Sequence, residues 1–285
     1  MEECVVRHVP LDEHYRMQTD ALETEIRSDR QAGLLPWLVA AAAGSTDTGA
    51  VDPLALVSDI AHHNRIWMHA DGAYGAMFAL CEMGKTILRG IQRADSVTMD
   101  PHKGLFMTMG TGAVLVRDGD NLLKAFRSHA NYLEGVETAS AKGEVSQADL
   151  SPELTRPFRG LRLWLALKLT GVAPFRAALE EKLLLARHFY EGLQRLDGFV
   201  AGPPPDLSVV TFRYRPSRGD ANEFNQKLIQ AIQQDGRIFL SSTQINGEVS
   251  LRLTVLGFRT HLETIALALE ILRHKAKEIE LGANS

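Results

Sequence analysis

Short apolar runs alternate with amphipathic stretches through the first half of the chain. Four of the runs have the length and composition of β-strands: residues 36–43, 65–70, 96–100 and 112–118. Three stretches before or between them repeat apolar positions at helical spacing: residues 18–31, 53–64 and 82–93. This alternation predicts an α/β fold with a mainly parallel sheet, and such sheets bind ligands beyond the carboxyl ends of their strands.

The second half of the chain has a different pattern. Residues 128–151 are small and polar without periodicity, which predicts a flap of the length kept for active-site lids. Helical and strand-like segments then follow in turn: helices at 156–169, 174–196, 219–234 and 260–279, and apolar runs at 209–214, 237–244 and 249–256. We expect a smaller α+β domain here, with the division near residue 165, giving domains 1–165 and 166–285.

Composition and charge narrow the choice of partner. The 285 residues are 45% hydrophobic and 23% charged, as in a folded protein with a sizeable core. A net charge of -4 gives no basic footprint, so nucleic acid and anionic membranes are excluded as expected partners, and a small soluble ligand is favoured.

Cysteine usage and the first residues predict the compartment. Cys4 and Cys81 stand far apart without metal-ligand spacing, which indicates a reducing compartment. The opening MEECVV is acidic where a signal peptide is basic, and the longest apolar run, near residues 34–43, is too short to span a bilayer. We therefore expect a cytoplasmic protein with no membrane segment.

Polar side chains gather where three of the predicted strands end. Six of them follow or close a strand: Ser45 and Thr46 the first, His69 and Asp71 the second, His102 and Lys103 the third. Parallel strands deliver such residues to one edge of the sheet. A lysine in an apolar setting is a candidate Schiff-base amine, although most lysines are simply solvated at the surface.

The segment HADGAYGA places Asp71 beside two glycines. Gly72 and Gly75 would leave room for a flat ligand to approach the backbone, and an aspartate there can hold a protonated ring nitrogen. The alternative is a strand-to-turn junction with an Asx turn. Together, Asp71 and Lys103 form the pair that pyridoxal phosphate chemistry requires, because the cofactor needs an amine to hold it and an acid near its pyridine nitrogen.

Three further matches give this pair a family resemblance. HADGAYGA is followed, 32 positions after Asp71, by the lysine of DPHKG; AGSTDTGAVDPL precedes them and RPFRGLRLWLALK follows. In this order the motifs resemble the group II pyridoxal-phosphate-dependent amino-acid decarboxylases, the family of aromatic-amino-acid and glutamate decarboxylases. The resemblance implies the mainly parallel large domain of fold-type I (aspartate-aminotransferase-like) enzymes, here incomplete, with a smaller C-terminal α+β domain.

The resemblance also implies roles for the strand-end residues. Lys103 would hold pyridoxal 5'-phosphate as an aldimine, and Asp71 would pair with its pyridine nitrogen. His102 would sit beside the phosphate or the substrate carboxylate, and Thr46 would support Asp71 and the ring. Two more residues complete the implied cofactor pocket: His69 and Ser45.

Tyr132, in the predicted flap, matches the loop tyrosine that in this family protonates the carbanion after carbon dioxide leaves. A phenylalanine at this place is associated with oxidative deamination, so Tyr132 favours simple decarboxylation. A phenol on a closing lid can deliver a proton to a carbanion shielded from water. The alternative for Tyr132 is an exposed loop aromatic.

Other polar residues have simpler interpretations. His62 and His63 suit a helix end, where a cation complements the dipole. The HxD spacing of His69 and Asp71 has no further ligands nearby, so we expect no metal. Arg252, in a predicted strand, could meet a substrate carboxylate. Three arginines at helical spacing fit a solvated or interface stripe: Arg156, Arg159 and Arg162.

The family's full-length members carry a long segment ahead of the matched region, with a histidine that stacks on the pyridine ring and a loop that grips the phosphate. The resemblance therefore implies that such a segment makes further cofactor contacts and covers the sheet. Many members have tryptophan at the position of Gly104, so the resemblance does not identify the substrate. We expect a homodimer that decarboxylates an L-amino acid, with aromatic substrates favoured. The alternatives are an incomplete fragment acting as a binding or dimerisation module, or another fold-type I enzyme such as an aminotransferase or desulfurase.

Overall fold

A four-stranded sheet organises the first half of the chain in the computed structural model, which describes residues 4–126 and 147–282. Its strands lie in the order β1 (Leu38–Ala42), β2 (Trp67–Gly72), β3 (Ser96–Met99) and β4 (Ala113–Val116). The first three strands pair in parallel and β4 is antiparallel to β3. The expected mainly parallel sheet is confirmed.

Seven helical elements of the described chain accompany this sheet, and α2 and η1 pack against its strands. They are α1 (Thr19–Gln31), α2 (Leu54–Asn64), η1 (Ala76–Leu80), α3 (Glu82–Ile87), η2 (Ile91–Arg93), α4 (Pro101–Gly104) and α5 (Gly119–Phe126). The single helix expected over residues 82–93 is wrong, because Gly90 breaks it with a φ of 106°. A Cβ at Gly90 would lie 2.3 Å from the Ala55 nitrogen, so α2 passes too close for any side chain at this position.

The second half forms a helix-covered antiparallel sheet. Its elements are α7 (Gly160–Thr170), α8 (Ala173–Leu193), β5 (Phe199–Ala201), β6 (Val209–Tyr214), α9 (Ala221–Asp235), β7 (Ser241–Ile245), β8 (Glu248–Thr254) and α10 (Leu262–Gly282). The strand order is β5-β6-β8-β7. The α+β character is as expected, and β5 is an additional short edge strand that the apolar pattern does not reveal.

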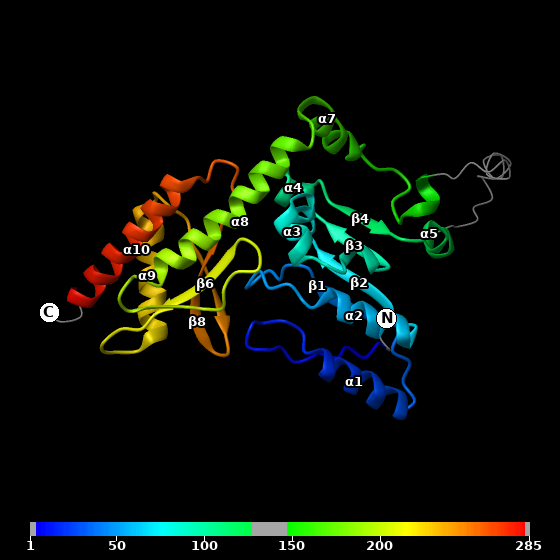
Figure 1. Ribbon diagram of the computed structural model, residues 1–285, viewed down its shortest axis with the longest axis horizontal. Helices are drawn as coiled ribbons and strands as arrows, with labels where there is room; N and C mark the ends of the chain where they lie inside the picture. The colour runs from blue at the N-terminus through cyan, green and yellow to red at the C-terminus, as the bar shows by residue number, and fades with distance from the viewer. Residues whose placement is uncertain (1–3, 127–146, 283–285) are drawn as a thin grey trace.

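Helix α8 links two apolar clusters, one under each sheet. Leu179 and Leu183 belong to the cluster of the first sheet, whereas Leu185 and Phe189 belong to that of the second. Figure 1 shows α8 running from α7 past the first sheet toward β6 and β8. The division at residue 165 stays a prediction. Helix α8 lies after residue 165, yet it packs in the apolar clusters of both sheets.

One face of the first sheet, the side that carries Leu38 and Ala40, is exposed along β1; we call it the open face. Along β1 the burial alternates, with Val39 and Ala41 buried but Leu38 and Ala40 exposed. Helix α2 contacts β1 and β2, and η1 contacts β2 and β3, on the buried side. Beside the open face, a cavity of about 1110 Å³ lies between residues 4–11, α1 and the start of β1. Within the described residues, every helix is too short or too polar to span a bilayer.

Candidate active site

The ends of β1, β2 and β3 lie side by side. In the register, Ala42 pairs with Asp71, and Asp71 pairs with Thr98. The loop after β1 carries Ser45 and Thr46, and α4 follows β3 directly. The strand-end residues expected from the sequence are therefore brought to one edge of the sheet.

Asp71 is exposed at this edge, and its Oδ1 accepts a hydrogen bond from the Ala73 nitrogen at 3.2 Å. The Asx turn considered as an alternative is thus present, and it leaves the second carboxylate oxygen available. His69, two residues earlier, is engaged within the sheet. Its Nδ1 lies 2.8 Å from Ser96 Oγ and its Nε2 lies 3.2 Å from Thr98 Oγ1.

The glycines of HADGAYGA serve packing rather than ligand approach, which corrects the sequence interpretation. A Cβ at Gly75 would lie 1.9 Å from the Ala43 carbonyl oxygen. A Cβ at Gly72 would lie 2.6 Å from Ala76 Cβ and 2.9 Å from the Thr98 oxygen. Both glycines let the turn after β2 press against neighbouring backbone.

Lys103 lies on the single turn of α4, with Pro101 at its first position. Its Nζ is 2.8 Å from Asp100 Oδ2, and its side chain is 43% exposed. The expected apolar setting is wrong at this residue, because the side chain is partly exposed to solvent and its amine pairs with a carboxylate three residues before it. The sequence reasoning missed Asp100, although the spacing within DPHK is the signal for such a pair.

His102 is partly buried and its orientation is fixed by one bond. Its Nδ1 lies 2.9 Å from the Thr111 carbonyl oxygen. Since a carbonyl can only accept, Nδ1 carries the hydrogen, and Nε2 faces Asp100 Oδ2 at 3.7 Å. Asp100 thus lies between the imidazole and the Lys103 amine.

The loop after β1 is held by the second sheet. Arg252 of β8 donates from Nε to the Asp47 carbonyl at 2.5 Å, and from Nη2 to the carbonyl of Thr46. Ser45 Oγ lies 2.8 Å from Thr48 Oγ1 within the loop. The Arg252 guanidinium, considered for a substrate carboxylate, is bonded here to backbone carbonyls.

Tyr74 is a second link that the sequence did not reveal. Its side chain is buried, and its hydroxyl lies 2.6 Å from Ser208 Oγ while accepting from the Ser208 nitrogen at 3.0 Å. Burial raises the pKa of Tyr74 to about 12. The hydroxyl stays neutral and joins the turn of HADGAYGA to the start of β6.

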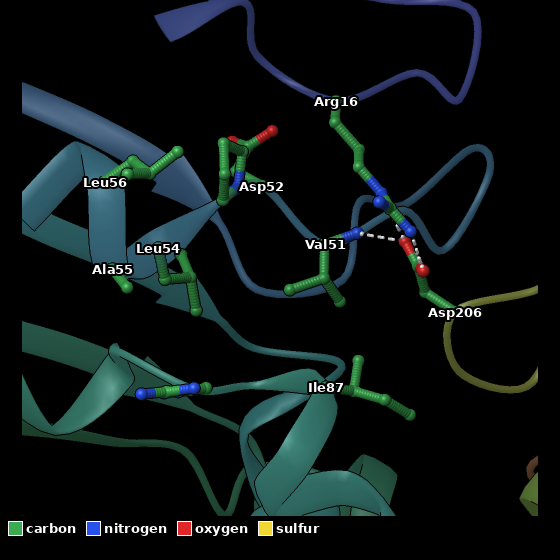
Figure 2. A pocket seen from close by; sticks show the side chains of 10 residues that line it. Arg16, Val51, Asp52, Leu54, Ala55, Leu56, Ile87 and Asp206 are labelled. Carbon is green, nitrogen blue, oxygen red and sulfur yellow. Dashed lines mark hydrogen bonds and ion pairs between the residues drawn. The ribbon is translucent and has the colours of Figure 1, made fainter.

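A smaller cavity, of about 310 Å³, lies at the start of α2. Figure 2 shows the side chains that line it. Arg16 points at Asp206 and pairs with it, and Asp206 Oδ2 accepts from the Val51 nitrogen at 2.9 Å. Asp52 accepts from the Met17 and Ala42 nitrogens, each at 2.7 Å, and burial raises its pKa. These bonds fix the loop between β1 and α2, and the strand-end residues take no part in the lining.

The other expected residues lie outside the edge. His62 and His63 are in the last turn of α2, as predicted. Two of the three arginines bond to nearby residues and the third to a distant one: Arg156 to Ser151 and Gln147, Arg159 to Glu153, and Arg162 to the Met109 carbonyl. Tyr132 lies outside the described residues, as does most of the expected flap.

Comparison with known proteins decides the family. The family model described as the pyridoxal-dependent decarboxylase conserved domain matches residues 1–215. The chain belongs to the pyridoxal-dependent decarboxylase family. Within it, an aromatic-L-amino-acid decarboxylase of Bacillus atrophaeus is 38% identical over 278 residues, covering 96% of this chain and 58% of that protein.

Other members of the decarboxylase family show the range of activities. A phenylacetaldehyde synthase of Arabidopsis thaliana is 28% identical, over 96% of this chain and 56% of its own length. The crystal structure of Oryza sativa TDC with PLP and tryptamine superposes with a TM-score of 0.88 at 29% identity, covering 96% of this chain and 58% of that one. This member of the family thus spans a little over half the length of these relatives, and its fold is that of fold-type I decarboxylases.

The residues at the sheet edge fit pyridoxal phosphate by their chemistry. An exposed amine at Lys103 and an exposed carboxylate at Asp71 are the two groups that the aldehyde and the ring nitrogen need. They lie on adjacent strand ends, with the Ser45–Thr46 loop on the next strand. His102 and Asp100 flank the amine.

Proposed function

We propose that this chain carries the cofactor lysine of a pyridoxal-phosphate-dependent decarboxylase that converts an L-amino acid to its amine and carbon dioxide. The observation that carries the proposal is the placement of Lys103 and Asp71 at adjacent strand ends in a member of this family. Aromatic substrates are favoured, because the relatives include decarboxylases named for aromatic amino acids, tyrosine and tryptophan.

Each residue of the edge has a task in this proposal. Pyridoxal phosphate, when bound, supplies the electron sink that makes loss of carbon dioxide feasible. Lys103 Nζ, with Asp100 Oδ2 2.8 Å away as a proton acceptor, would hold the cofactor through its aldehyde. Asp71 holds a proton on the ring nitrogen. His102 binds the phosphate or the substrate carboxylate.

Four further residues complete the assignment. Ser45 and Thr46 lie on the loop after β1, whose backbone carbonyls Arg252 binds, and they line the cofactor pocket together with His69 of β2. Tyr132 returns a proton to the substrate Cα after decarboxylation. Because some relatives are phenylacetaldehyde synthases, the tyrosine at 132 is what favours the amine over the aldehyde as product.

We further propose a cytoplasmic homodimer. The two described cysteines, Cys4 and Cys81, are both free, which supports a reducing compartment. Uncovered apolar side chains on α7, including Trp164 and Leu169, support association with a second subunit. The alternative proposal is a chain that binds or dimerises without catalysis.

Visible absorbance of the chain mixed with pyridoxal phosphate tests the assignment of Lys103. We expect a lysine-bound cofactor band in the wild type and its loss in Lys103→Ala. Lys85→Ala is the matched control, because Lys85 pairs with Glu82 at the same three-residue spacing and its side chain is 52% exposed, against 43% for Lys103. A band that survives Lys103→Ala refutes the assignment, and a band in neither protein supports the non-catalytic alternative.

A second assay separates the products. Carbon dioxide and amine in equal amounts, from an aromatic amino acid, are expected for decarboxylation, and Tyr132→Phe should shift the product toward aldehyde. Equal rates with glutamate and aromatic substrates would contradict the substrate preference.

A further inference from the structure

Lys182 on α8 is charged and fully buried, with 0% exposure. It lies at the junction of the two apolar clusters, between Leu179 and Leu183 of one and Leu185 of the other. Its Nζ donates to Glu181 Oε2 at 2.8 Å, to the Thr260 carbonyl at 2.6 Å and to the Phe258 carbonyl at 3.4 Å. Burying an ammonium is costly unless it is bonded, and an apolar side chain would avoid that cost, so these bonds call for an explanation.

The bonds fix the segment between β8 and α10. Lys182 holds two of its carbonyls, and the other oxygen of Glu181 lies 2.7 Å from His261 Nδ1. The segment begins at Val255, whose nitrogen donates to the Ser208 carbonyl at 2.8 Å. Consecutive residues of α8 therefore anchor this connection to the helix that links the two sheets.

The anchored segment carries Phe258 onto the turn that follows Lys103. The rings of Phe258 and Phe106 are 5.5 Å apart and tilted by 59°. Phe106 has a φ of 57°, in the left-handed region that a bulky side chain adopts only when its surroundings enforce it. Its nitrogen also donates to the Lys103 carbonyl at 3.4 Å. A row of contacts thus runs from Lys182 through Phe258 and Phe106 to the end of α4.

We propose that Lys182 is a positioning residue for Lys103. By holding the backbone at residues 258–260, it seats the Phe258 ring on Phe106 and fixes the direction in which α4 presents the Lys103 amine. The inference rests on the proposed function in one respect only, the assignment of Lys103 as the cofactor lysine.

Four variants test this. Lys182→Met removes the anchor, and Phe258→Ala removes the ring contact while leaving the backbone carbonyls that Lys182 binds. Phe258→Tyr keeps the aromatic contact, and because the position is 61% exposed the added hydroxyl can point into solvent. Lys227→Met is the control, because that lysine pairs with Glu223 on the surface of α9. We expect Lys182→Met and Phe258→Ala to weaken pyridoxal phosphate binding about tenfold, and the other two to match the wild type.

A second readout needs no cofactor. A brief pulse of acetic anhydride, followed by peptide mass spectrometry, gives the acetylation rate of Lys103 relative to Lys85. We expect this ratio to shift in the same direction in Lys182→Met and Phe258→Ala, and to stay unchanged in Phe258→Tyr and Lys227→Met. If the wild type fails to bind cofactor, the proposed function fails while this ratio still tests the positioning.

Two results would overturn the inference. One is a folded Phe258→Ala protein with the wild-type acetylation ratio, which also decides the case if Lys182→Met does not fold. The other is an equal shift in Lys227→Met, which would show a general effect of removing a charge.

Discussion

The Tyr74 hydroxyl is the clearest residue-scale source of pH dependence in the described structure. Unfolded tyrosine ionises near pH 10, whereas burial raises the pKa of Tyr74 to about 12. Its contribution to stability is complete below pH 10 and is lost as pH rises toward 12, because only the unfolded chain releases the proton there. We expect this one group to remove about 2 to 3 kcal/mol of unfolding free energy across that window. Urea unfolding at a series of pH values measures it.

Tyr74→Phe separates this effect from other alkaline titrations. At pH 7 the variant should lose about 1 to 2 kcal/mol, because Ser208 keeps its burial but loses its partner. Its stability should then fall less steeply than the wild type above pH 10. Parallel curves for the two proteins would mean that Tyr74 is solvated and that the link to Ser208 is not made.

At the scale of elements, the turn after β2 depends on Gly75. We expect Gly75→Ala to cost about 1 to 3 kcal/mol, because its Cβ would lie 1.9 Å from the Ala43 oxygen and the turn must move away from β1. Gly119→Ala, with open space around it at the start of α5, is the matched control and should be neutral or slightly stabilising. Thermal unfolding compares them. Equal stabilities would show that the turn yields without cost.

The same elements show what the sequence could and could not reveal. The spacing of apolar residues within β1, α2, β2 and β3 is a local property, so the apolar pattern predicted where these elements lie in the chain. The parallel register of the strands then brings Asp71 and α4 to one edge of the sheet. The break at Gly90, the packing role of Gly75 and the Tyr74–Ser208 bond depend on which distant backbone lies nearby. Likewise, Arg252 reaches the Thr46 loop across about two hundred positions of sequence, a contact that no periodicity encodes.

At the scale of the whole molecule, the entry to β1, beside the open face, leaves apolar side chains in water. Leu35 is 82% exposed and Trp37 is 58% exposed at the entry to β1, beside the cavity of about 1110 Å³. These neighbouring side chains expose more contiguous apolar surface than scattered single residues do, and such a surface favours association. We expect the 285-residue chain to self-associate in sedimentation velocity, and Leu35→Glu with Trp37→Ser to reduce it. Phe239→Glu, at an isolated exposed phenylalanine, is the control.

The outcome distinguishes the two uncovered apolar surfaces. If association persists in the double variant but falls in Trp164→Ser with Leu169→Glu, contact between copies runs through α7 and the open face is free in the assembly. If it falls only in the Leu35 and Trp37 variant, copies meet at the entry to β1, beside the open face, which reaches the exposed Asp71 at the end of β2. Binding of pyridoxal phosphate should then compete with self-association, because a second copy of the chain at the sheet edge would block the cofactor from that edge.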